Sequence, residues 1–475
     1  MKLLFGVLLC AVCVARVYGQ DCSTMNFRLR SEIPSGCATM TMTMQHDALD
    51  RPYLYVANKE AGLRVYDVSS PDTPALVANI PVSAFDTLDV MNLSQKDTRL
   101  YIALGNTFTN PQSGGMAIVD VTDPLAPVVT DTYVVPASRS GAGIVVVEGA
   151  YAYLGAMQSG LVVLDVSDPR TIRPLSQYLP DINFPPVPNP NPNLYNARGM
   201  DVRAGIVYLC YDAGGVRIID CTIPTAPVEV GRWCNPVMYT PLNRPKAYNN
   251  AVLDDSLLYV AADYCGMEVL DVRKPASIRL HGWWNPYNCP DNNWFASPSH
   301  TNEMVLDRNC RRLFLSTGKS DMIVLDVSNP ARPDSCNFYG GVSNDIGTWG
   351  IGVWRDQIYL SYICALVPFV SSWTGVRLLT YAPCTGSGLH DPLPVAHSLY
   401  PNPTRGMLTI EMHEAAPAAL LLHITNTAGR RVGPQRLFSG RITFDTRQLA
   451  RGRYYFHIRS GDGTRIVSAG EFVVE

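Results

Sequence analysis

A phrase that recurs through most of the chain constrains its fold more than any other feature. Each copy contains a short strand, a turn that usually contains Gly, a second strand of β-branched residues and Leu, and an Asp-x-x-x-Pro turn. Six copies keep this last turn, and its aspartates are Asp67, Asp120, Asp165, Asp220, Asp271 and Asp326. A degenerate seventh copy begins at Ile358 and lacks both the Asp and the Pro.

Further apolar strands lie before and after these copies, so each unit has four strands and no room for a helix. The units recur every 40 to 60 residues, and stacking such sheets around an axis buries faces that one unit leaves open. We therefore expect an all-β chain with a seven-bladed β-propeller. The seventh copy supplies only three strands, so residues 25–33 (MNFRLRSEI) should add the outer strand of the last blade and close the ring.

Composition agrees with this architecture and excludes several others. The 475 residues are 47% hydrophobic and only 17% charged, with 36 Gly and 36 Pro, which argues against a disordered tail, a coiled coil or a helical array. The net charge is -3 and the Lys and Arg residues form no cluster, so we expect no nucleic acid partner.

The six repeated aspartates allow two interpretations. They could form a ring of metal ligands, or they could each open a turn by accepting backbone N–H groups before the Pro. Repetition from blade to blade is typical of a structural role, so we interpret these six aspartates as turn residues.

The phrase GLRVYDVSSPDTP and its copies resemble the LVIVD repeat family of β-propellers, over residues 26–381. The composition then changes after Cys384. We expect residues 20–384 to form the propeller, 385–397 a linker and 398–475 a second domain. That last segment has ten Arg, no Lys and six acidic residues, and its alternating strands between Gly turns predict a small antiparallel, Ig-like β-sandwich.

The motifs of the last segment resemble the C-terminal sorting domain of the type IX secretion system of Bacteroidetes-like bacteria. The matching residues are Tyr400, Pro401, Asn402, Pro403 and Gly406 in the opening motif, Gly429 in a hairpin, and Gly452 and Tyr454 in an L-x-x-G-x-Y motif. The resemblance implies engagement with the outer-membrane secretion machinery, removal of the module, and a secreted or cell-surface location.

The start of the chain is typical of a signal peptide, which we assign to residues 1–19. Met1 and Lys2 precede an apolar run of about 12 residues, which is shorter than a membrane helix requires, and Gly19 suits cleavage before Gln20. No later stretch qualifies as a transmembrane span. The exported chain would keep eleven of the 13 cysteines, which we expect to form disulfides with one thiol left over, because no C-x-x-C pair suggests a metal site. Cys22, at the start of the closing strand, and Cys384, at the end of its neighbour, are expected to pair.

Long insertions are concentrated on one face of the predicted propeller, where the chain crosses between blades. Their aromatic residues alternate with Asn and Pro and would suit sugar rings or a protein partner. The candidates are Trp233, Tyr239, Tyr248, Trp283, Trp284, Tyr287, Trp294, Trp349 and Trp373. Alternatively, these residues pack the long loops onto the blade edges, with Cys234, Cys265 and Cys289 stapling them.

Catalytic signatures are absent from the sequence, which has no G-x-S-x-G elbow, H-E-x-x-H pair or phosphate-binding Gly loop. We therefore expect a non-catalytic binding or adhesion module without a cofactor, acting on a glycan or protein ligand. The alternative is a secreted metal-assisted hydrolase or lyase. It would gather acidic residues near the channel mouth, for which Asp201, Asp254, Glu303 and Asp345 are the candidates.

Overall fold

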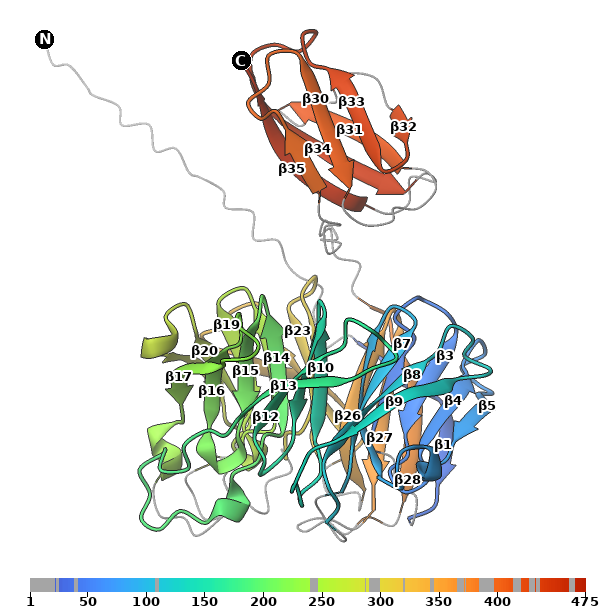
Figure 1. Cartoon of the computed structure of the whole chain (residues 1–475), viewed down its shortest axis with the longest axis vertical. Coiled ribbons are helices and arrows are strands. Elements are labelled where there is room, and N and C mark those ends of the chain that lie inside the picture. The colour runs from blue at the N-terminus through green and yellow to red at the C-terminus, as the bar shows by residue number, and fades with distance from the viewer. Residues whose placement is uncertain are drawn as a thin grey trace, which may run out of the picture. The chain divides into compact units, whose positions relative to one another are not determined.

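The chain divides into two compact units, Met1–Thr385 and Gly386–Glu475, and each is considered by itself. The predicted signal peptide and all but the last residue of the predicted linker lie outside the described residues. The computed structural model (Figure 1) describes residues 22, 25–37, 42–106, 111–239, 247–286, 288–289, 300–318, 321–341, 346–364, 371, 373–383, 397–412, 420–426, 432, 436–460 and 466–475.

The first unit contains seven four-stranded antiparallel sheets, which are the blades of a β-propeller. Blade 1 comprises β2 (Thr43–His46), β3 (Tyr53–Ala57), β4 (Leu63–Asp67) and β5 (Ala75–Ile80). Blade 2 comprises β6 (Val90–Lys96), β7 (Arg99–Leu104), β8 (Gly115–Asp120) and β9 (Val128–Val134). Blade 3 comprises β10 (Ile144–Glu148), β11 (Tyr151–Gly155), β12 (Leu161–Asp165) and β13 (Arg173–Tyr178).

The next three blades follow the same order. Blade 4 comprises β14 (Gly199–Arg203), β15 (Ile206–Cys210), β16 (Val216–Asp220) and β17 (Val228–Trp233). Blade 5 comprises β18 (Asn250–Asp254), β19 (Leu257–Ala261), β20 (Met267–Asp271) and β21 (Arg279–Trp284). Blade 6 comprises β22 (Met304–Asp307), β23 (Arg312–Ser316), β24 (Met322–Asp326) and β25 (Asp334–Tyr339). The described helices of this unit are 3-10 turns, and within the described residues no helix has the length and apolar character needed to cross a membrane.

Blade 7 confirms the predicted ring closure. It is built from β26 (Gly347–Trp354), β27 (Gln357–Ile363), β28 (Thr374–Thr380) and the N-terminal β1 (Arg28–Ser35). β1 pairs antiparallel with β28, from Arg28 opposite Thr380 to Ser35 opposite Thr374. The innermost strands β2, β6, β10, β14, β18, β22 and β26 contact one another in this order, and β26 contacts β2.

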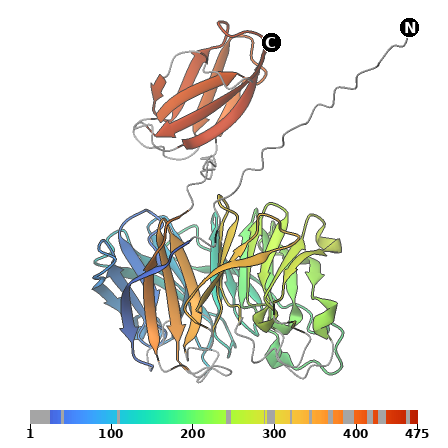
Figure 2. The ribbon, with the colours of Figure 1, turned by 180° about the vertical axis from the view of Figure 1, so that it is seen from behind.

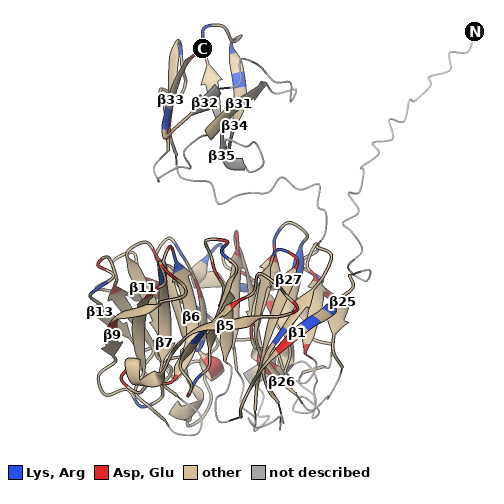
Figure 3. Cartoon of the chain, turned by 90° about the vertical axis from the view of Figure 1, so that its right-hand side faces the viewer, with Lys and Arg blue, Asp and Glu red and all other residues tan. Residues whose placement is uncertain are grey.

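The closing strand is also tied by side-chain hydrogen bonds to blade 1 and to the neighbouring strand of its own blade. β1 carries both signs of charge (Figure 3), and Arg30 Nε donates to Asp72 Oδ1 of blade 1 at 2.7 Å. On blade 7, Arg377 Nε donates to Glu32 Oε1 at 2.9 Å. Figure 2 shows β1 (blue) beside the last strands of the propeller (orange), so the two ends of the repeat region lie side by side.

The predicted Cys22–Cys384 disulfide is wrong. Cys22 bonds to Cys336 of β25, and Cys37 bonds to Cys364, while Cys384 lies outside the described residues. The chain before β1 runs past blade 7 to blade 6, where Asn337 Nδ2 donates to the carbonyls of both Cys22 and Met25 at 2.8 Å. The closing strand is therefore held by a disulfide near each end.

The expectation of one leftover thiol also needs correction. A third disulfide joins Cys265 and Cys289, but Cys210, Cys221 and Cys234 are buried thiols. All three contribute to the apolar clusters between blades 3, 4 and 5, so they behave as small hydrophobic residues.

The repeated aspartates are turn residues, as predicted. In each of the six turns, Oδ1 of the Asp accepts the backbone N–H two residues later, at 2.8 to 3.1 Å. In each of these blades, the pairing of the third strand with the fourth strand shifts register once. The shift lies between the residues two positions and one position before the Asp. The six turns therefore share one geometry, which explains why the phrase is repeated.

The residue two positions after the second strand has a positive φ in five blades. Its φ lies between 30° and 57°, at Lys59, Met157, Asp212, Asp263 and Gly318. The carbonyl of each accepts an N–H from the segment that enters the next blade, at 2.9 to 3.3 Å. Apolar side chains then fill the spaces between neighbouring blades, and these clusters form the core of the unit.

The second unit is a sandwich of two antiparallel sheets. One sheet has the order β29 (His397–Tyr400), β30 (Met407–Met412), β33 (Arg441–Asp445). The other has the order β32 (Arg436–Phe438), β31 (Leu420–Asn426), β34 (Gly452–Ser460), β35 (Ile466–Val474). Both sheets contribute to one apolar core.

Two of the motif tyrosines in this unit make hydrogen bonds within it. Tyr400 Oη donates to Glu411 at 2.7 Å, and Tyr454 Oη donates to the Ala450 carbonyl at 2.7 Å. Gly429 lies outside the described residues.

Candidate functional site

Three consecutive crossings between blades carry the long insertions, and they all enter inner strands from the same face. The crossings span residues 179–198, 234–249 and 285–303, and they lead into blades 4, 5 and 6. Their described parts include the short turns η3 (Pro192–Leu194) and η5 (Pro236–Tyr239). The green helical turns at the lower edge of the propeller in Figure 1 mark this face, which we call the insertion face.

The first insertion is anchored by Arg217 on β16, a side chain with no solvent exposure. Its guanidinium donates to the carbonyls of Asp181 at 2.8 Å and Phe184 at 2.9 Å, and it pairs with Glu229 at 3.2 Å. It also lies over the Phe184 ring, 5.0 Å from the centroid. A buried charge with this many partners holds the loop in one position.

The second insertion is anchored by Glu268 on β20. Its carboxylate accepts hydrogen bonds from Trp233 Nε1 at 2.9 Å, Asn235 Nδ2 at 2.7 Å and Tyr248 Oη at 3.2 Å. Burial raises the pKa of Glu268 despite these three donors. Glu268 lies opposite Val260, just as Arg217 lies opposite Leu209, so both anchors occupy the same position of the repeat.

The third insertion is tied down by covalent and polar contacts. Cys289 is bonded to Cys265 in η6 (Asp263–Cys265), and Trp283 Nε1 donates to the Cys265 carbonyl at 2.8 Å. At the other end of this crossing, His300 Nε2 lies 2.8 Å from Asp263 Oδ1. The described ends of this crossing are therefore fixed to blade 5.

The aromatic candidates do not form one exposed surface. Tyr248 has no solvent exposure and Trp284 only 5%, so neither can contact a ligand, because both pack into the cores beside blade 5. Trp233 and Trp283 are half-buried and use their ring N–H groups to hold loops. Trp373 packs against Tyr362 with ring centroids 5.0 Å apart. Tyr287, Trp294 and the side chain of Tyr239 lie outside the described residues.

Trp349 is the aromatic candidate that reaches the central channel. The starts of the inner strands of all seven blades converge there, and we call this region the channel mouth. The narrow part has a volume of about 40 Å³ and continues into a wider chamber of about 430 Å³. The residues of the mouth are Met42, Met91, Asn92, Ala142, Gly143, Ile144, Met157, Arg198, Asn249, Asn250, Asn302, Glu303 and Trp349.

Two asparagines present unsatisfied acceptors at the mouth. Asn249 is 5% exposed and donates through Nδ2 to the Thr301 carbonyl at 2.7 Å. Asn302 is 3% exposed and donates through Nδ2 to the Thr348 carbonyl at 3.0 Å. The Oδ1 atom of each is buried and has no hydrogen-bond partner among the described residues. Such atoms normally bind water or a ligand, because an unpaired buried acceptor costs about 1 to 3 kcal/mol.

Charged groups complete the mouth. The Arg198 guanidinium lies 5.1 Å from the centroid of the Trp349 ring, and Arg198 Nη1 lies 3.4 Å from Asp212 Oδ1. Burial raises the pKa of Glu303 to about 7, although the Ile351 N–H, Thr43 and the charge of Arg198 all favour its ionised form. Donor, acceptor and aromatic groups from four blades are thus gathered at one opening.

The predicted acidic cluster does not assemble. Asp201 accepts the Leu253 N–H at 2.7 Å and the Val202 N–H at 2.7 Å, whereas Asp254 pairs with Arg308 at 3.1 Å and Arg311 at 2.5 Å. Asp345 lies outside the described residues. In the part of the chain that the structure describes, no three His, Cys, Asp or Glu residues are placed to hold one metal ion. Asp201 and Glu303 instead each accept an N–H from the inner strand of the next blade, Asp201 from Leu253 and Glu303 from Ile351. These N–H groups lie at the inner edge of each blade, where no further strand pairs with them.

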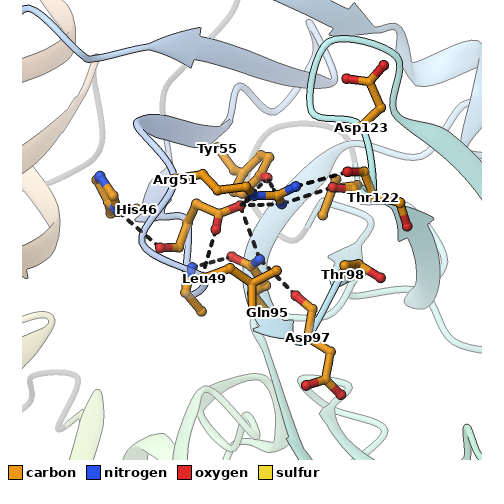
Figure 4. A network of polar contacts seen from close by, with 12 residues as sticks. His46, Leu49, Arg51, Tyr55, Gln95, Asp97, Thr98, Thr122 and Asp123 are labelled. Carbon is orange, nitrogen blue, oxygen red and sulfur yellow. Dashed lines mark hydrogen bonds and ion pairs between the residues drawn. The ribbon is translucent and has the colours of Figure 1, made fainter. Parts of the chain in front are cut away.

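The opposite end of the channel is built differently. His46 stacks on Trp354 with ring centroids 4.4 Å apart, and both rings line the chamber. Beside them, Asp47 accepts hydrogen bonds from Arg51 at 2.6 Å and Tyr55 at 2.6 Å (Figure 4). Burial opposes ionisation of Asp47, but these bonds hold its pKa below the ordinary value. Arg51 also reaches the Val121 and Thr122 carbonyls, so this network joins blade 1 to blade 2.

Sequence reasoning missed Arg217, Glu268, Arg198, Asn249 and Asn302. A signal for the first two was present, since each places a charge at a position of the repeat that is apolar in blades 2, 3 and 6, where Ala117, Val162 and Ile323 stand. The other three carry no such signal, because each lies just before an inner strand in a segment of irregular composition.

Comparison with known families and structures agrees with this architecture. A model described as "Secretion system C-terminal sorting domain" matches residues 398–469, and a model described as "LVIVD repeat" matches residues 50–81, 141–173 and 314–339. No curated protein matches the chain.

Solved structures match the fold at low sequence identity. The WD40 repeats of RRP9 superpose with a TM-score of 0.52 at 10% identity, covering 75% of this chain and 100% of that chain. The WD40 β-propeller domain of Doa1 gives a TM-score of 0.48 at 8% identity, covering 75% of this chain and 97% of that chain. At such identities the match with RRP9 indicates the fold alone.

Proposed function

The chain carries LVIVD repeats in a β-propeller and a secretion-system C-terminal sorting domain, and on this premise we propose that the propeller is a non-catalytic binding or adhesion module. The sorting domain implies engagement with the type IX secretion machinery and a secreted or surface-attached product. A ligand for such a protein is extracellular, and we assign its chemistry to a glycan or a protein.

The observation that supports this function best is the rigid anchoring of the insertions beside the channel mouth. Arg217, Glu268 and the Cys265–Cys289 disulfide hold three consecutive loops by three different means. Loops positioned by a rigid scaffold are where binding residues are usually found, and fixing them before binding reduces the entropic cost of association.

Two tryptophans of β26 allow a matched test. Trp349 lies at the channel mouth under Arg198, and Trp354 lies at the opposite end with Arg355 5.8 Å from its ring centroid. The full secreted protein would be applied to an array of glycans and to a panel of immobilised extracellular proteins. We expect Trp349→Ala to weaken binding at least tenfold and Trp354→Ala to leave it unchanged. Equal effects of the two variants, or no ligand in either panel, would contradict the proposal.

A secreted metal-assisted hydrolase or lyase is the second candidate, and one observation favours it. Glu303 lies at the mouth with its pKa raised to about 7, which is suitable for general acid–base chemistry near neutral pH. Elemental analysis of the purified protein, and hydrolysis assays on model esters and glycosides with Glu303→Gln as the control, would test it. Stoichiometric metal and Glu303-dependent turnover would favour the enzyme over the binding module.

A further inference from the structure

The two unsatisfied amide oxygens at the channel mouth indicate what kind of group the mouth accepts. Which atom of each side-chain amide is the oxygen follows from the hydrogen bond that the nitrogen makes. Thr301 and Thr348 offer backbone carbonyls, which can only accept, so the Nδ2 of Asn249 and of Asn302 must point toward them. Each Oδ1 is then the atom left without a partner, and both residues line the mouth.

The two asparagines occupy the same position in neighbouring blades. The N–H of Asn249 donates to the Ala261 carbonyl and the N–H of Asn302 donates to the Ser316 carbonyl, in both cases where the inner strand begins beside the second strand. The blade entries on both sides supply different groups at this opening, namely Arg198 from blade 4 and Trp349 from blade 7. Blades 5 and 6 therefore contribute a pair of acceptors between a donor and an aromatic ring.

The polar groups of the mouth favour a neutral ligand over an anion or a cation. An anion would meet Arg198 but also the two amide oxygens and Glu303, which are acceptors. A cation would meet those oxygens but also the guanidinium of Arg198. A neutral polyol satisfies both kinds of group, because each hydroxyl donates one hydrogen bond and accepts others. Met42, Met91, Met157 and the Trp349 ring supply apolar surface for C–H groups.

We propose that the channel mouth is a saccharide-binding subsite in which Oδ1 of Asn249 and Oδ1 of Asn302 accept hydrogen bonds from sugar hydroxyls. This inference rests on the proposed binding function and names its ligand class. The mouth is narrow, at about 40 Å³, so it would receive the hydroxyls at the end of a glycan, and the wider chamber that His46 and Trp354 line is not part of the subsite.

Asn196 provides a matched control for the test. It is 8% exposed, its Nδ2 donates to Asp212 Oδ2 at 2.8 Å, and its Oδ1 is also buried without a partner, but it does not line the mouth. Asn302→Leu and Asn196→Leu therefore remove the same chemistry from two positions, of which one faces the channel. Arg198→Gln, at a side chain that is 22% exposed, is a second mouth variant that disturbs the core less.

Titration of the full secreted protein with neutral saccharides selected on a glycan array would give the dissociation constants. We expect Asn302→Leu and Arg198→Gln each to weaken binding about tenfold, the loss typical of one hydrogen bond, with Asn196→Leu unchanged. Thermal unfolding of each variant would identify any that fail to fold. If Asn302→Leu does not fold, the dissociation constant of Arg198→Gln decides whether the saccharide binds at the mouth.

The possible failures are distinguishable. Binding of a defined protein with no response to any saccharide would overturn this inference and leave the proposed function standing. Saccharide binding that is weakened equally by Asn302→Leu and Asn196→Leu, or that Arg198→Gln leaves unchanged, would overturn the assignment to the mouth. The absence of any ligand, with only water at the amide oxygens, would overturn both.

Discussion

At the scale of single residues, a few buried or half-buried polar side chains distinguish this propeller from a regular repeat. Arg217 and Glu268 replace apolar residues at one position of the repeat and fasten two insertions. Asp201 and Glu303 bind N–H groups at the edges of adjacent inner strands. Each of these groups is stabilised by several hydrogen bonds, because a buried charge without partners would be costly.

The pH dependence of stability should report on Glu303. Its pKa is raised from 4.5 to about 7 in the folded protein, so between these values the unfolded chain has released the proton that the folded chain still binds. The free energy of unfolding should therefore fall as the pH rises from about 4.5 to about 7, by up to about 3 kcal/mol, and then level off. Chemical unfolding of wild type and Glu303→Gln across this range measures the difference. A Glu303→Gln variant with the same pH profile as wild type would contradict the assignment.

The anchor role of Arg217 can be tested against Arg64, which occupies the same position of blade 1 but is half-buried. We expect Arg217→Met to destabilise the protein by about 2 to 4 kcal/mol, because it leaves the Asp181 and Phe184 carbonyls without their donor, although Arg232 still pairs with Glu229 at 2.7 Å. Arg64→Met should cost less than about 1 kcal/mol. Unfolding midpoints give the energies, and faster hydrogen exchange near residues 181–184 in Arg217→Met alone would report release of the loop. Similar losses in both variants would argue against a special role of Arg217.

At the scale of elements, β1 determines whether the ring is closed. It completes blade 7, contacts blade 1 through Arg30, and is bracketed by disulfides from Cys22 and Cys37. A propeller closed only by hydrogen bonds between its first and last segments could open at that seam, since no backbone joins them there. The two disulfides connect residues 314 and 327 positions apart in sequence, so they link the seam covalently.

Removal of these disulfides should cost more than removal of the third. Loop-closure entropy assigns about 5 to 6 kcal/mol to a separation of 314 residues and about 3 to 4 kcal/mol to the 24 residues between Cys265 and Cys289, as upper values. Both double variants, Cys22→Ser/Cys336→Ser and Cys265→Ser/Cys289→Ser, would be made in a Cys37→Ser/Cys364→Ser background and compared by chemical unfolding, because the Cys37–Cys364 disulfide would otherwise still close the long loop. Equal losses, or a smaller loss for the seam, would show that the closing strand is held mainly by its hydrogen bonds.

At the scale of the whole molecule, the chain has two units with separate cores, and each unit has its own role. The propeller core lies between its blades, and the sandwich core is built from the facing sides of two small sheets. The sorting domain accounts for export, while the insertion face of the propeller supplies the proposed binding surface.

The separate cores predict independent unfolding. Calorimetry of the full chain should show two transitions, and deletion of residues 398–475 should remove one of them without shifting the other by more than about 2 °C. The same deletion should leave the protein inside the cell, because the sorting domain is lost. A single transition for the full chain, or normal export of the shortened chain, would contradict this division of roles.

Local patterns in the sequence determined the strands, the number of blades, the turn role of the aspartates and the sandwich at the end, because hydrophobic periodicity and turn chemistry act over a few residues. Only the tertiary structure decided that Cys22 meets Cys336, that Tyr248 and Trp284 are buried, and that Asn249 and Asn302 share one opening. Those outcomes depend on how the ring closes and where each insertion docks, which bring together side chains that are far apart in the chain and carry no common local signal.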